Sequence, residues 1–357
     1  MKSRYFSDGD GIYTAGIGEY KWTFWPYELS FRRPVRTSRG GYTVRGGWYL
    51  RAEHGGHSGT GEVAPLPDLS PETPEQVQTL LRRICNREQP LTMDELPSSV
   101  RFGMECAALN LRNGGALLFP SAFTDGKEGI ATNGLIWMDT PQRQQAQAAA
   151  KLEEGFRCVK LKIGALQFED DLRMLEFIRR RSPDVIIRVD ANGAFPPEAA
   201  LGKLRRLADF HIHSIEQPIA AGQWPQMRRL CAESPIPIAL DEELIGVAAK
   251  EQKEQLLEAV RPQYLVLKPS LHGGLSGSEE WIALARQYGA GWWITSALET
   301  NIGLTALAQW TYIMNSSLHQ GLGTGQLFVG NPPSPLELRG ERLWYNPEKQ
   351  CGWDITN

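Results

Sequence analysis

Hydrophobic and polar positions follow two different patterns along the chain, and the change comes near residue 130. Before it, stretches rich in aromatic and β-branched residues, such as "TFWPYELSFRRP" (23–34), alternate with Gly-rich turns and predict short strands. Two segments with apolar residues at helical spacing follow, over 70–85 and 98–112. Strands followed by helices, without alternation, predict a small α+β unit over about residues 24–115.

From about residue 130 short apolar runs alternate with helical stretches. The runs are "NGLIWM", "CVKLKIG", "VIIRVDANG", "HSIEQP", "IPIALDE", "YLVLKPS", "GWWITSA" and "HQGLGTG". This alternation predicts a (β/α) barrel over residues 116–329. The alternative is an open doubly wound sheet, which favours a GxGxxG motif after its first strand. The Gly-rich "HGGLSGS" (272–278) does not have that spacing.

The two chain ends have separate expectations. The segment "PLELRGERLWYN" (335–346) again predicts strands, and we expect residues 330–357 to return to the first unit. Residues 1–23 are expected to form an N-terminal extension, since they have no apolar stretch typical of a signal peptide. The chain has no run of 18 apolar residues, so we expect no membrane-spanning segment.

Composition narrows the class of protein. With 357 residues, 41% hydrophobic residues and a net charge of −3, the chain is typical of a globular protein and has no basic excess for nucleic acid. Its five cysteines are scattered and form no CxxC pair, which argues against zinc and redox motifs. We therefore expect reduced thiols and a cytoplasmic location. The sequence supports no prediction about oligomeric state.

Charged residues recur at a nearly constant interval at the ends of the apolar runs. Lys162 is followed by Asp190, Glu216, Asp241 and Lys268, with gaps of 28, 26, 25 and 27 residues. One strand–helix unit of a barrel has about this length, so the five side chains are expected to meet at one rim, where barrel enzymes place their active sites. One acidic residue alone is equally well explained as a helix cap. Five at one period favour a site.

Three of these residues are carboxylates. Asp190, Glu216 and Asp241 need a cation if they are crowded together, and Mg²⁺ prefers such oxygen ligands. Mn²⁺ and Ca²⁺ accept the same ligand type. Asn192 lies two residues after Asp190 on the same strand face, where it can orient a ligand or act as a turn residue before Gly193.

Three lysines join the carboxylates. In "VKLKIG" (159–164) Lys160 and Lys162 alternate with apolar residues, so both point to one face of the strand. A single lysine is usually exposed to solvent, but a neighbouring cation and burial favour the neutral amine. We therefore predict that Lys162 is a general base and that Lys160 and Lys268 stay positively charged.

The charges of this group predict its ligand. With Lys162 neutral, the three carboxylates, one Mg²⁺ and two protonated lysines leave a net charge of +1, which favours a small-molecule carboxylate. A carboxylate held beside a base invites removal of the proton α to it. The metal and Lys268 would stabilise the resulting enediolate.

The chain resembles the muconate-lactonizing subgroup of the enolase superfamily over nearly its whole length. The motifs that carry the resemblance are "GTGEVAPLPDLSPET" (59–73), "KLK", "DANG", "EQP", "DE", "LKPS", "TSALETNIG" and "GLGTG". It implies a (β/α)7β modified TIM barrel with an α+β capping domain built from both chain ends. It also implies a metal on Asp190, Glu216 and Asp241, Lys162 as the base, and Lys268 on the opposite face of the substrate.

Within the subgroup, the last strands distinguish the families. The segment "GLGTG" (321–325) has none of the carboxylates of dipeptide epimerases or muconate-lactonizing enzymes, and "ITSALET" (294–300) has no histidine base of the mandelate type. "TSRGGY" (37–42) and "GLGTGQLF" (321–328) are similar to the o-succinylbenzoate synthase family. This resemblance implies a lyase of menaquinone biosynthesis that dehydrates a succinyl-hydroxycyclohexadiene carboxylate. N-succinylamino acid racemases and other racemases or epimerases of the superfamily are the alternative.

Contacts to the succinyl group are predicted near the last strands and in a loop of the cap. The candidates for its carboxylate are Thr295, Ser296, Thr324 and Gly325. Arg39 lies in a cap loop that could close over the site. Each of these residues is equally well explained as an ordinary turn residue or as a solvent-exposed residue.

Two other classes of protein stay open. A catalytically inactive binding barrel is disfavoured by the intact set of base and metal ligands. A metal-dependent barrel hydrolase would use histidine ligands, which these strand ends lack.

Overall fold

The computed structural model describes residues 17–37, 40–88, 93–165, 167–349, 351 and 353. Its elements, in chain order, are η1 (Ile17–Glu19), β1 (Lys21–Thr37), β2 (Gly40–His54), β3 (His57–Val63), α1 (Pro74–Cys85), η2 (Met93–Glu95), α2 (Ser98–Asn113), β4 (Ile130–Ala131), β5 (Gly134–Ile136), α3 (Pro141–Glu153), β6 (Cys158–Lys162), α4 (Phe168–Arg181), β7 (Ile186–Asp190), α5 (Pro197–Ala208), β8 (Ser214–Glu216), α6 (Trp224–Glu233), β9 (Ile238–Leu240), η3 (Glu242–Leu244), α7 (Lys250–Val260), β10 (Tyr264–Leu267), α8 (Gly274–Gln287), β11 (Gly291–Ile294), α9 (Asn301–Met314), β12 (Leu336–Arg339) and β13 (Arg342–Tyr345).

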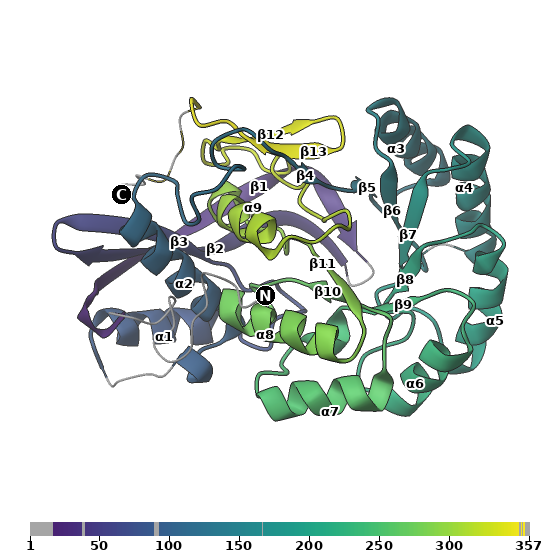
Figure 1. Cartoon of the computed structure of the whole chain (residues 1–357), viewed down its shortest axis with the longest axis horizontal. Coiled ribbons are helices and arrows are strands. Elements are labelled where there is room, and N and C mark those ends of the chain that lie inside the picture. The colour runs from purple at the N-terminus through teal and green to yellow at the C-terminus, as the bar shows by residue number, and fades with distance from the viewer. Residues whose placement is uncertain are drawn as a thin grey trace.

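The largest sheet is parallel and has seven strands in the order β11-β10-β9-β8-β7-β6-β5. Helices α3 to α8 lie in an arc around the outer side of this curved sheet (Figure 1). The ring is closed by Gln320 and Gly321, which bridge to Thr132 beside β5 and to Thr295 beyond β11. Seven strand–helix units and a short eighth strand confirm the predicted (β/α)7β barrel. The eighth strand is much shorter than the run "HQGLGTG" predicts.

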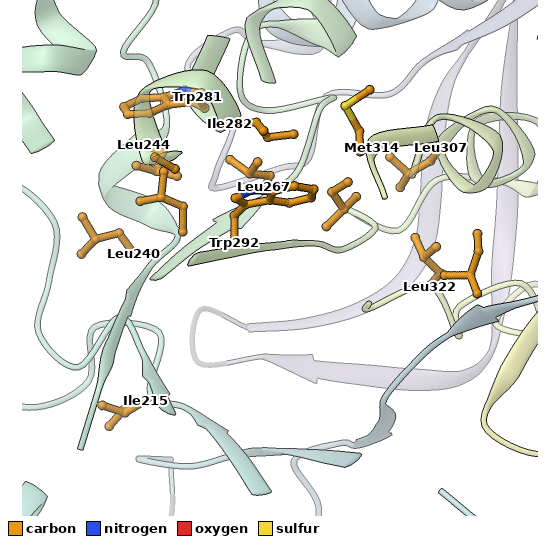
Figure 2. Packing of buried hydrophobic residues seen from close by; sticks show 14 of the residues in the cluster. Ile215, Leu240, Leu244, Leu267, Trp281, Ile282, Trp292, Leu307, Met314 and Leu322 are labelled. Atoms are coloured by element: carbon orange, nitrogen blue, oxygen red, sulfur yellow. The ribbon is translucent and has the colours of Figure 1, made fainter. Parts of the chain in front are cut away.

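Along each strand, successive side chains point to opposite faces of the barrel wall. In β6, Val159 and Leu161 point outward into the main apolar core, while Lys160 and Lys162 point inward. In β10, Leu265 and Leu267 lie in the same outer core. Figure 2 shows this packing between β8–β11 and helices α8 and α9, with Leu240, Leu267, Trp281 and Trp292 among its members. The outward side chains of these strands are therefore packed against the helices, and the interior holds the two lysines as well as a small apolar cluster of Ala239, Val266 and Trp293.

The cap consists of the antiparallel sheet β1-β2-β3 with α1 and α2. Helix α1 starts at a capping box, in which Thr73 accepts from the Gln76 amide and the Gln76 side chain accepts from the Thr73 amide. Strand β3 packs closely against α2. A Cβ at Gly61 would lie 2.0 Å from the Gly103 carbonyl oxygen and one at Gly59 would lie 2.1 Å from the Leu111 amide nitrogen, so only glycine allows this approach.

Two buried carboxylates of the cap bind the N-termini of two barrel helices. Glu62 of β3 accepts from the Thr300 and Gly303 amides at the start of α9, at 2.9 and 2.8 Å. Glu105 of α2 accepts from the Leu275 amide at the start of α8, at 2.6 Å. Negative charge is favourable at these helix ends. The cap is thus fastened to the barrel beside the helices that follow the last two strands of the seven-stranded sheet.

Some elements differ from the sequence-based expectation. The first hairpin has two long strands of 17 and 15 residues instead of several short ones, because β1 and β2 pair along almost their whole length. Strands β12 and β13 form a hairpin, and β13 pairs with β4 rather than with a strand of the cap sheet, although Thr60 of β3 donates to the Trp353 carbonyl. The expected division into an extension (1–23), a cap (24–115 with 330–357) and a barrel (116–329) stays a prediction. Within the described residues, we find no helix with the length and hydropathy needed to cross a membrane.

Candidate active site

The charged residues predicted at strand ends meet inside the barrel. They come from neighbouring strands, and register pairs Lys162 with Asp190 and Asp190 with Glu216. The full group consists of Lys160 and Lys162 from β6, Asp190 from β7, Glu216 from β8, Asp241 directly after β9 and Lys268 directly after β10. All lie at the C-terminal ends of the parallel strands, the end at which barrel enzymes place their active sites.

Lys160 lies between two of the carboxylates. Its Nζ is 2.6 Å from Glu216 Oε2 and 2.9 Å from Asp190 Oδ2. Its side chain is only 9% exposed, so both lysines of "VKLKIG" point to the interior, not to solvent. A buried ammonium group requires such partners.

Lys162 has a second, different set of contacts. Its Nζ donates to Asp190 Oδ2 at 2.7 Å and to Asn192 Oδ1 at 2.8 Å. The other end of the same amide, Asn192 Nδ2, donates to Glu242 Oε1 at 3.0 Å. Asn192 therefore holds the lysine that we predict to be the base, and it links that lysine to a fourth carboxylate.

Lys268 enters from the far side of the ring. Its Nζ pairs with Asp241 Oδ2, and its backbone amide donates to His272 Nδ1 at 3.0 Å. Strands β6 and β10 are four positions apart in a ring of eight, so Lys162 and Lys268 face each other across the barrel.

The pKa values follow from burial and from these contacts. Burial raises the pKa of Glu216 well above its usual value, and the adjacent Asp190 adds to the effect. Burial acts in the same direction on Asp190, but Lys160 and Lys162 outweigh it and the pKa of Asp190 falls well below its usual value. Burial lowers the pKa of Lys160, yet Asp190 and Glu216 raise it above the ordinary value. Lys160 is therefore a permanent cation.

The same balance keeps Lys268 charged. Burial lowers its pKa, and the Coulombic attraction of Asp241 and Glu216 more than reverses this, so the net pKa is raised. With Glu242 included, the site has four carboxylates and three lysine amines. Carboxylates are in excess, which is why a proton or another cation is favoured beside Glu216.

Whether a metal ion fits this site depends on the carboxylate oxygens that have no contact with a lysine. Within the described residues, no three acidic, His or Cys side chains are grouped as a metal site, since the lysine amines lie between the carboxylates. Glu216 Oε1 and Asp241 Oδ1, however, are buried and have no hydrogen-bond partner in the described part of the chain. Buried carboxylate oxygens without partners are costly, and a hard divalent cation would satisfy both. The donor set therefore fits such an ion.

A cavity lies directly over this charged group. Its floor includes Lys160, Lys162, Lys268, Asn192 and Glu242. One wall is polar and is formed by Asn133, Thr295, Ser296, Gly321, Gly323 and Thr324. The other is apolar and includes Tyr42, Leu66, Leu69, Trp137 and Leu298, partly from the cap. The cavity thus suits a molecule with a carboxylate near the lysines and both a polar and an apolar part.

The predicted substrate residues are only partly brought together. Thr295, Ser296 and Thr324 line the cavity, and the Ser296 and Thr324 hydroxyls lie 2.7 Å apart. Gly325 faces a second cavity behind this wall, next to Asn301 and Leu304 of α9. Arg39 lies outside the described residues. The roles of all five stay predictions.

Sequence reasoning missed several cavity residues. Asn133 is 5% exposed and its Oδ1 has no hydrogen-bond partner in the described residues, although it lies in the polar wall. In the sequence, Asn133-Gly134 reads as an ordinary turn before a strand. Glu242 belongs to the acidic run of residues 241–243 at the start of η3, which by sequence alone is explained as helix-start charges. For Trp137 the only available signal was its place just after the first barrel strand.

Comparison with known proteins identifies the family. The model of the family described as "Enolase C-terminal domain-like" matches residues 143–338, more than half of the chain. The chain belongs to the enolase superfamily. A second model, "MenC, N-terminal domain", matches residues 20–111. Members of the superfamily use a divalent metal ion, which agrees with the donor set.

Two curated relatives illustrate the range of similarity. The o-succinylbenzoate synthase of Desulfotalea psychrophila is 45% identical over 355 residues, covering 88% of this chain and 96% of the relative. The L-Ala-D/L-Glu epimerase of Bacillus subtilis is 26% identical over 185 residues, covering 51% of this chain and 50% of the relative. The similarity to the synthase is thus both higher and much more extensive.

Solved structures agree with the fold. The crystal structure of MenC from Desulfotalea psychrophila has a TM-score of 0.82 and 42% identity, covering 91% of this chain and 99% of that chain. The Bacillus subtilis epimerase in complex with substrate has a TM-score of 0.79 at 18% identity, covering 93% and 97%, and shows the shared fold alone. A cap on a (β/α)7β barrel is therefore confirmed.

Proposed function

We propose that the chain is an o-succinylbenzoate synthase, a lyase of menaquinone biosynthesis. It removes water from 2-succinyl-6-hydroxy-2,4-cyclohexadiene-1-carboxylate and produces o-succinylbenzoate. The observation that carries the proposal is the position of Lys162 and Lys268 on opposite sides of one cavity, with the three carboxylates supplied by the strands between them. The 45% identity to the synthase of Desulfotalea psychrophila supports this reaction over others of the superfamily.

Asp190, Glu216 and Asp241 would hold the divalent ion, which we propose to be Mg²⁺, with Mn²⁺ as the alternative. The partnerless oxygens of Glu216 and Asp241 support this assignment, as does the preference of Mg²⁺ for carboxylate ligands. When bound, the ion supplies positive charge to the substrate carboxylate and so favours the loss of the α proton.

Lys162 moves the proton in both steps. As a neutral amine it takes the proton from the carbon α to the carboxylate, leaving an enediolate. The protonated Lys162 then donates the same proton to the departing hydroxide on the same face of the ring, so that one water is released and the ring becomes aromatic. Asn192 orients the amine through its contact at 2.8 Å.

Lys268 and Lys160 act as fixed positive charges. Both have a raised pKa and remain protonated. Lys268 faces Lys162 across the cavity and would stabilise the enediolate electrostatically. As the ring becomes aromatic, a cation–π contact with this ammonium group adds to the stabilisation. Lys160 lies two residues before Lys162 on β6 and contributes its positive charge to the same end of the cavity.

The polar wall would bind the succinyl end of the substrate. Thr295, Ser296 and Thr324 offer hydroxyl groups, and Asn133 offers an amide whose oxygen has no partner within the described chain. Gly325 and Arg39 stay candidates for substrate contacts. The apolar wall would pack against the cyclohexadiene ring.

Racemisation of N-succinylamino acids is a second candidate activity. Lys162 and Lys268 lie on opposite sides of the cavity, so Lys162 could take a proton from one face of an α carbon and the protonated Lys268 could donate one to the other face. The same polar wall would bind the succinyl group. The two reactions therefore share one site.

The direct test is turnover of the cyclohexadiene substrate with Mg²⁺, followed by absorbance of the aromatic product. We expect product with the wild-type chain and a kcat lower by about 10³-fold or more in Lys162→Ala. Lys127→Ala, on an exposed surface pair with Asp125, is the control and should keep wild-type kcat. Absence of product, or full activity of Lys162→Ala, would refute the proposal. Deuterium exchange into N-succinylamino acids tests the second activity.

A further inference from the structure

The closure of the barrel depends on a very short strand. In the described part of the chain, the gap between β5 and β11 is bridged by Gln320 and Gly321. On one side the Gln320 amide donates to Ala131 O and the Gln320 carbonyl accepts from the Asn133 amide, both at 2.8 Å. On the other side the Gly321 amide donates to Ile294 O at 2.7 Å and the Gly321 carbonyl accepts from the Ser296 amide at 3.0 Å. The register of this seam therefore rests on the hydrogen bonds of two residues.

The seam directly precedes the polar wall of the cavity. Gly321 is a bridging residue that itself lines the site, and Gly323 and Thr324, which also line it, follow without any intervening element. A small shift of Gln320 along its neighbours would move all three. The geometry of the substrate's non-reacting end is therefore set by how firmly the eighth strand is held.

Glu341, in the turn of the β12–β13 hairpin, contacts the eighth strand and the segments that lead into β5 and β6. Its Oε1 accepts from Arg157 Nε at 2.6 Å, just before β6. Its Oε2 lies 3.1 Å from His319 Nε2, at the start of the eighth strand. Its backbone oxygen accepts from the Thr132 amide at 2.8 Å, beside β5. The residue is 8% exposed.

The proposed chemistry does not use this residue. Arg157 precedes β6 and Lys162 ends it, so Glu341 lies at the opposite end of the barrel from the cavity, about 16 Å away at 3.3 Å per residue. Strand β13 fixes the hairpin itself by pairing with β4 at Arg342 and Leu343. The hairpin thus carries its carboxylate to the seam on a rigid support.

We propose that the β12–β13 hairpin is a clasp for the barrel and that Glu341 is a positioning residue. Its carboxylate holds the start of the eighth strand to the start of β6, and its carbonyl holds β5 to the same point. The clasp fixes the register of Gln320 and Gly321 and, through them, the wall that binds the succinyl end of the substrate. This last step rests on the proposed function.

The test compares Glu341→Gln with the wild-type chain by hydrogen exchange and kinetics. Loss of the charged contacts should speed amide exchange of Gly321 and Leu322 by tenfold or more, without a matching change in β8. With the cyclohexadiene substrate, KM should rise at least fivefold while kcat stays within twofold, because the weakened contacts bind a non-reacting group. Glu337→Gln, on the same hairpin in a half-exposed pair with Arg339, is the control and should change neither.

The two measurements separate the possible failures. Unchanged exchange at Gly321 and Leu322 in Glu341→Gln would overturn the clasp, whatever the kinetics. Faster exchange over all of β5–β11 would show general destabilisation and would also overturn it. If Glu341→Gln does not fold, Arg157→Gln removes the other half of the pair from a side chain that is 71% exposed, and the same outcomes apply. Exchange needs no turnover, so failure of the proposed reaction would be seen separately.

Discussion

A lysine buried inside a barrel needs hydrogen-bonding or charged partners, and these partners determine its role in the site. Lys160 lies between Asp190 and Glu216 and stays charged, whereas Lys162 shares Asp190 and is held by the neutral amide of Asn192. The two residues are identical and two positions apart, so their difference comes from these contacts alone. Asn192 has a φ of 43°, a left-handed conformation that asparagine tolerates better than most residues.

Removing the amide of Asn192 tests its part in orienting the base. Asn192→Gly keeps the left-handed backbone without strain and should lower kcat by about 10- to 100-fold, with KM changed much less, because the lysine loses its orienting contact. Steady-state kinetics with the cyclohexadiene substrate measures both constants. Asn86→Gly at the exposed end of α1 is the control. A variant at Asn192 with wild-type kcat would exclude this role.

Elements are joined in this chain by buried polar contacts as well as by apolar packing. Glu62 of β3 accepts from the Tyr27 hydroxyl at 2.5 Å, from the Thr300 hydroxyl at 2.6 Å and from two amides at the start of α9. Both carboxylate oxygens are used, and the residue is fully buried. A single side chain therefore links the cap sheet to the helix that follows β11.

Glu62→Gln should destabilise the chain by about 2 kcal/mol. The new amide group would place a donor against donors from α9 or Tyr27 and leave buried groups unsatisfied. Urea unfolding measures the change in the free energy of unfolding. Glu53→Gln removes the surface pair with Lys21 on the neighbouring strand and should cost less than about 1 kcal/mol. Equal effects of the two substitutions would contradict the argument.

The whole barrel is needed to assemble the site, because each strand contributes only one or two of its residues. Asp190, Glu216 and Asp241 are 51 positions apart from first to last and are neighbours only in the folded ring. An ion that binds all three therefore binds the folded state and not the unfolded chain. Such binding stabilises the fold by mass action.

Mg²⁺ should raise the free energy of unfolding by about 2.7 kcal/mol when its concentration is 100 times the dissociation constant. Asp241→Asn removes one ligand and should abolish most of this increase. Thermal unfolding with and without Mg²⁺, and after chelation, measures it. Asp184→Asn, at an exposed position before β7, should retain the full increase. An equal response of Asp241→Asn and wild type would rule out this ligand set.

His213, directly before β8, is expected to make the stability of the fold depend on pH. Burial, with the charge of Arg188, lowers the pKa of His213 to about 4, and its ring packs on Tyr264 at a centroid distance of 5.0 Å. The unfolded residue titrates near 6.5, so between pH 6.5 and 4 the unfolded chain binds more protons. This contribution to stability is present above pH 6.5 and is lost as the pH falls toward 4.

His213→Gln removes that contribution. Compared with wild type, the loss of unfolding free energy between pH 7 and pH 4.5 should be smaller by about 1 kcal/mol, a value reduced for the solvent exposure of the ring. Urea unfolding at the two pH values measures the difference. His57→Gln, at the exposed start of β3, should follow the wild-type curve. Identical pH dependence in His213→Gln and wild type would contradict the prediction.

Local patterns were sufficient for the seven strand–helix units of the barrel and for the charged group. The alternation in "VKLKIG" and the near-constant spacing of Lys162, Asp190, Glu216, Asp241 and Lys268 depend only on strand geometry and on the length of one strand–helix unit. Both can be read without knowing which residues are in contact. The barrel and the membership of the site were predictable for this reason.

Contacts between distant segments could not be read in this way. The pairing of β12–β13 with β4, the two-residue eighth strand, and the place of Asn133 and Glu242 in the cavity depend on how the ring closes. The difference between Lys160 and Lys162 also depends on how the ring closes, since it arises from partners 28 to 56 positions away. A sequence carries the periodicity of each element, whereas burial and charge pairing arise only when the elements pack.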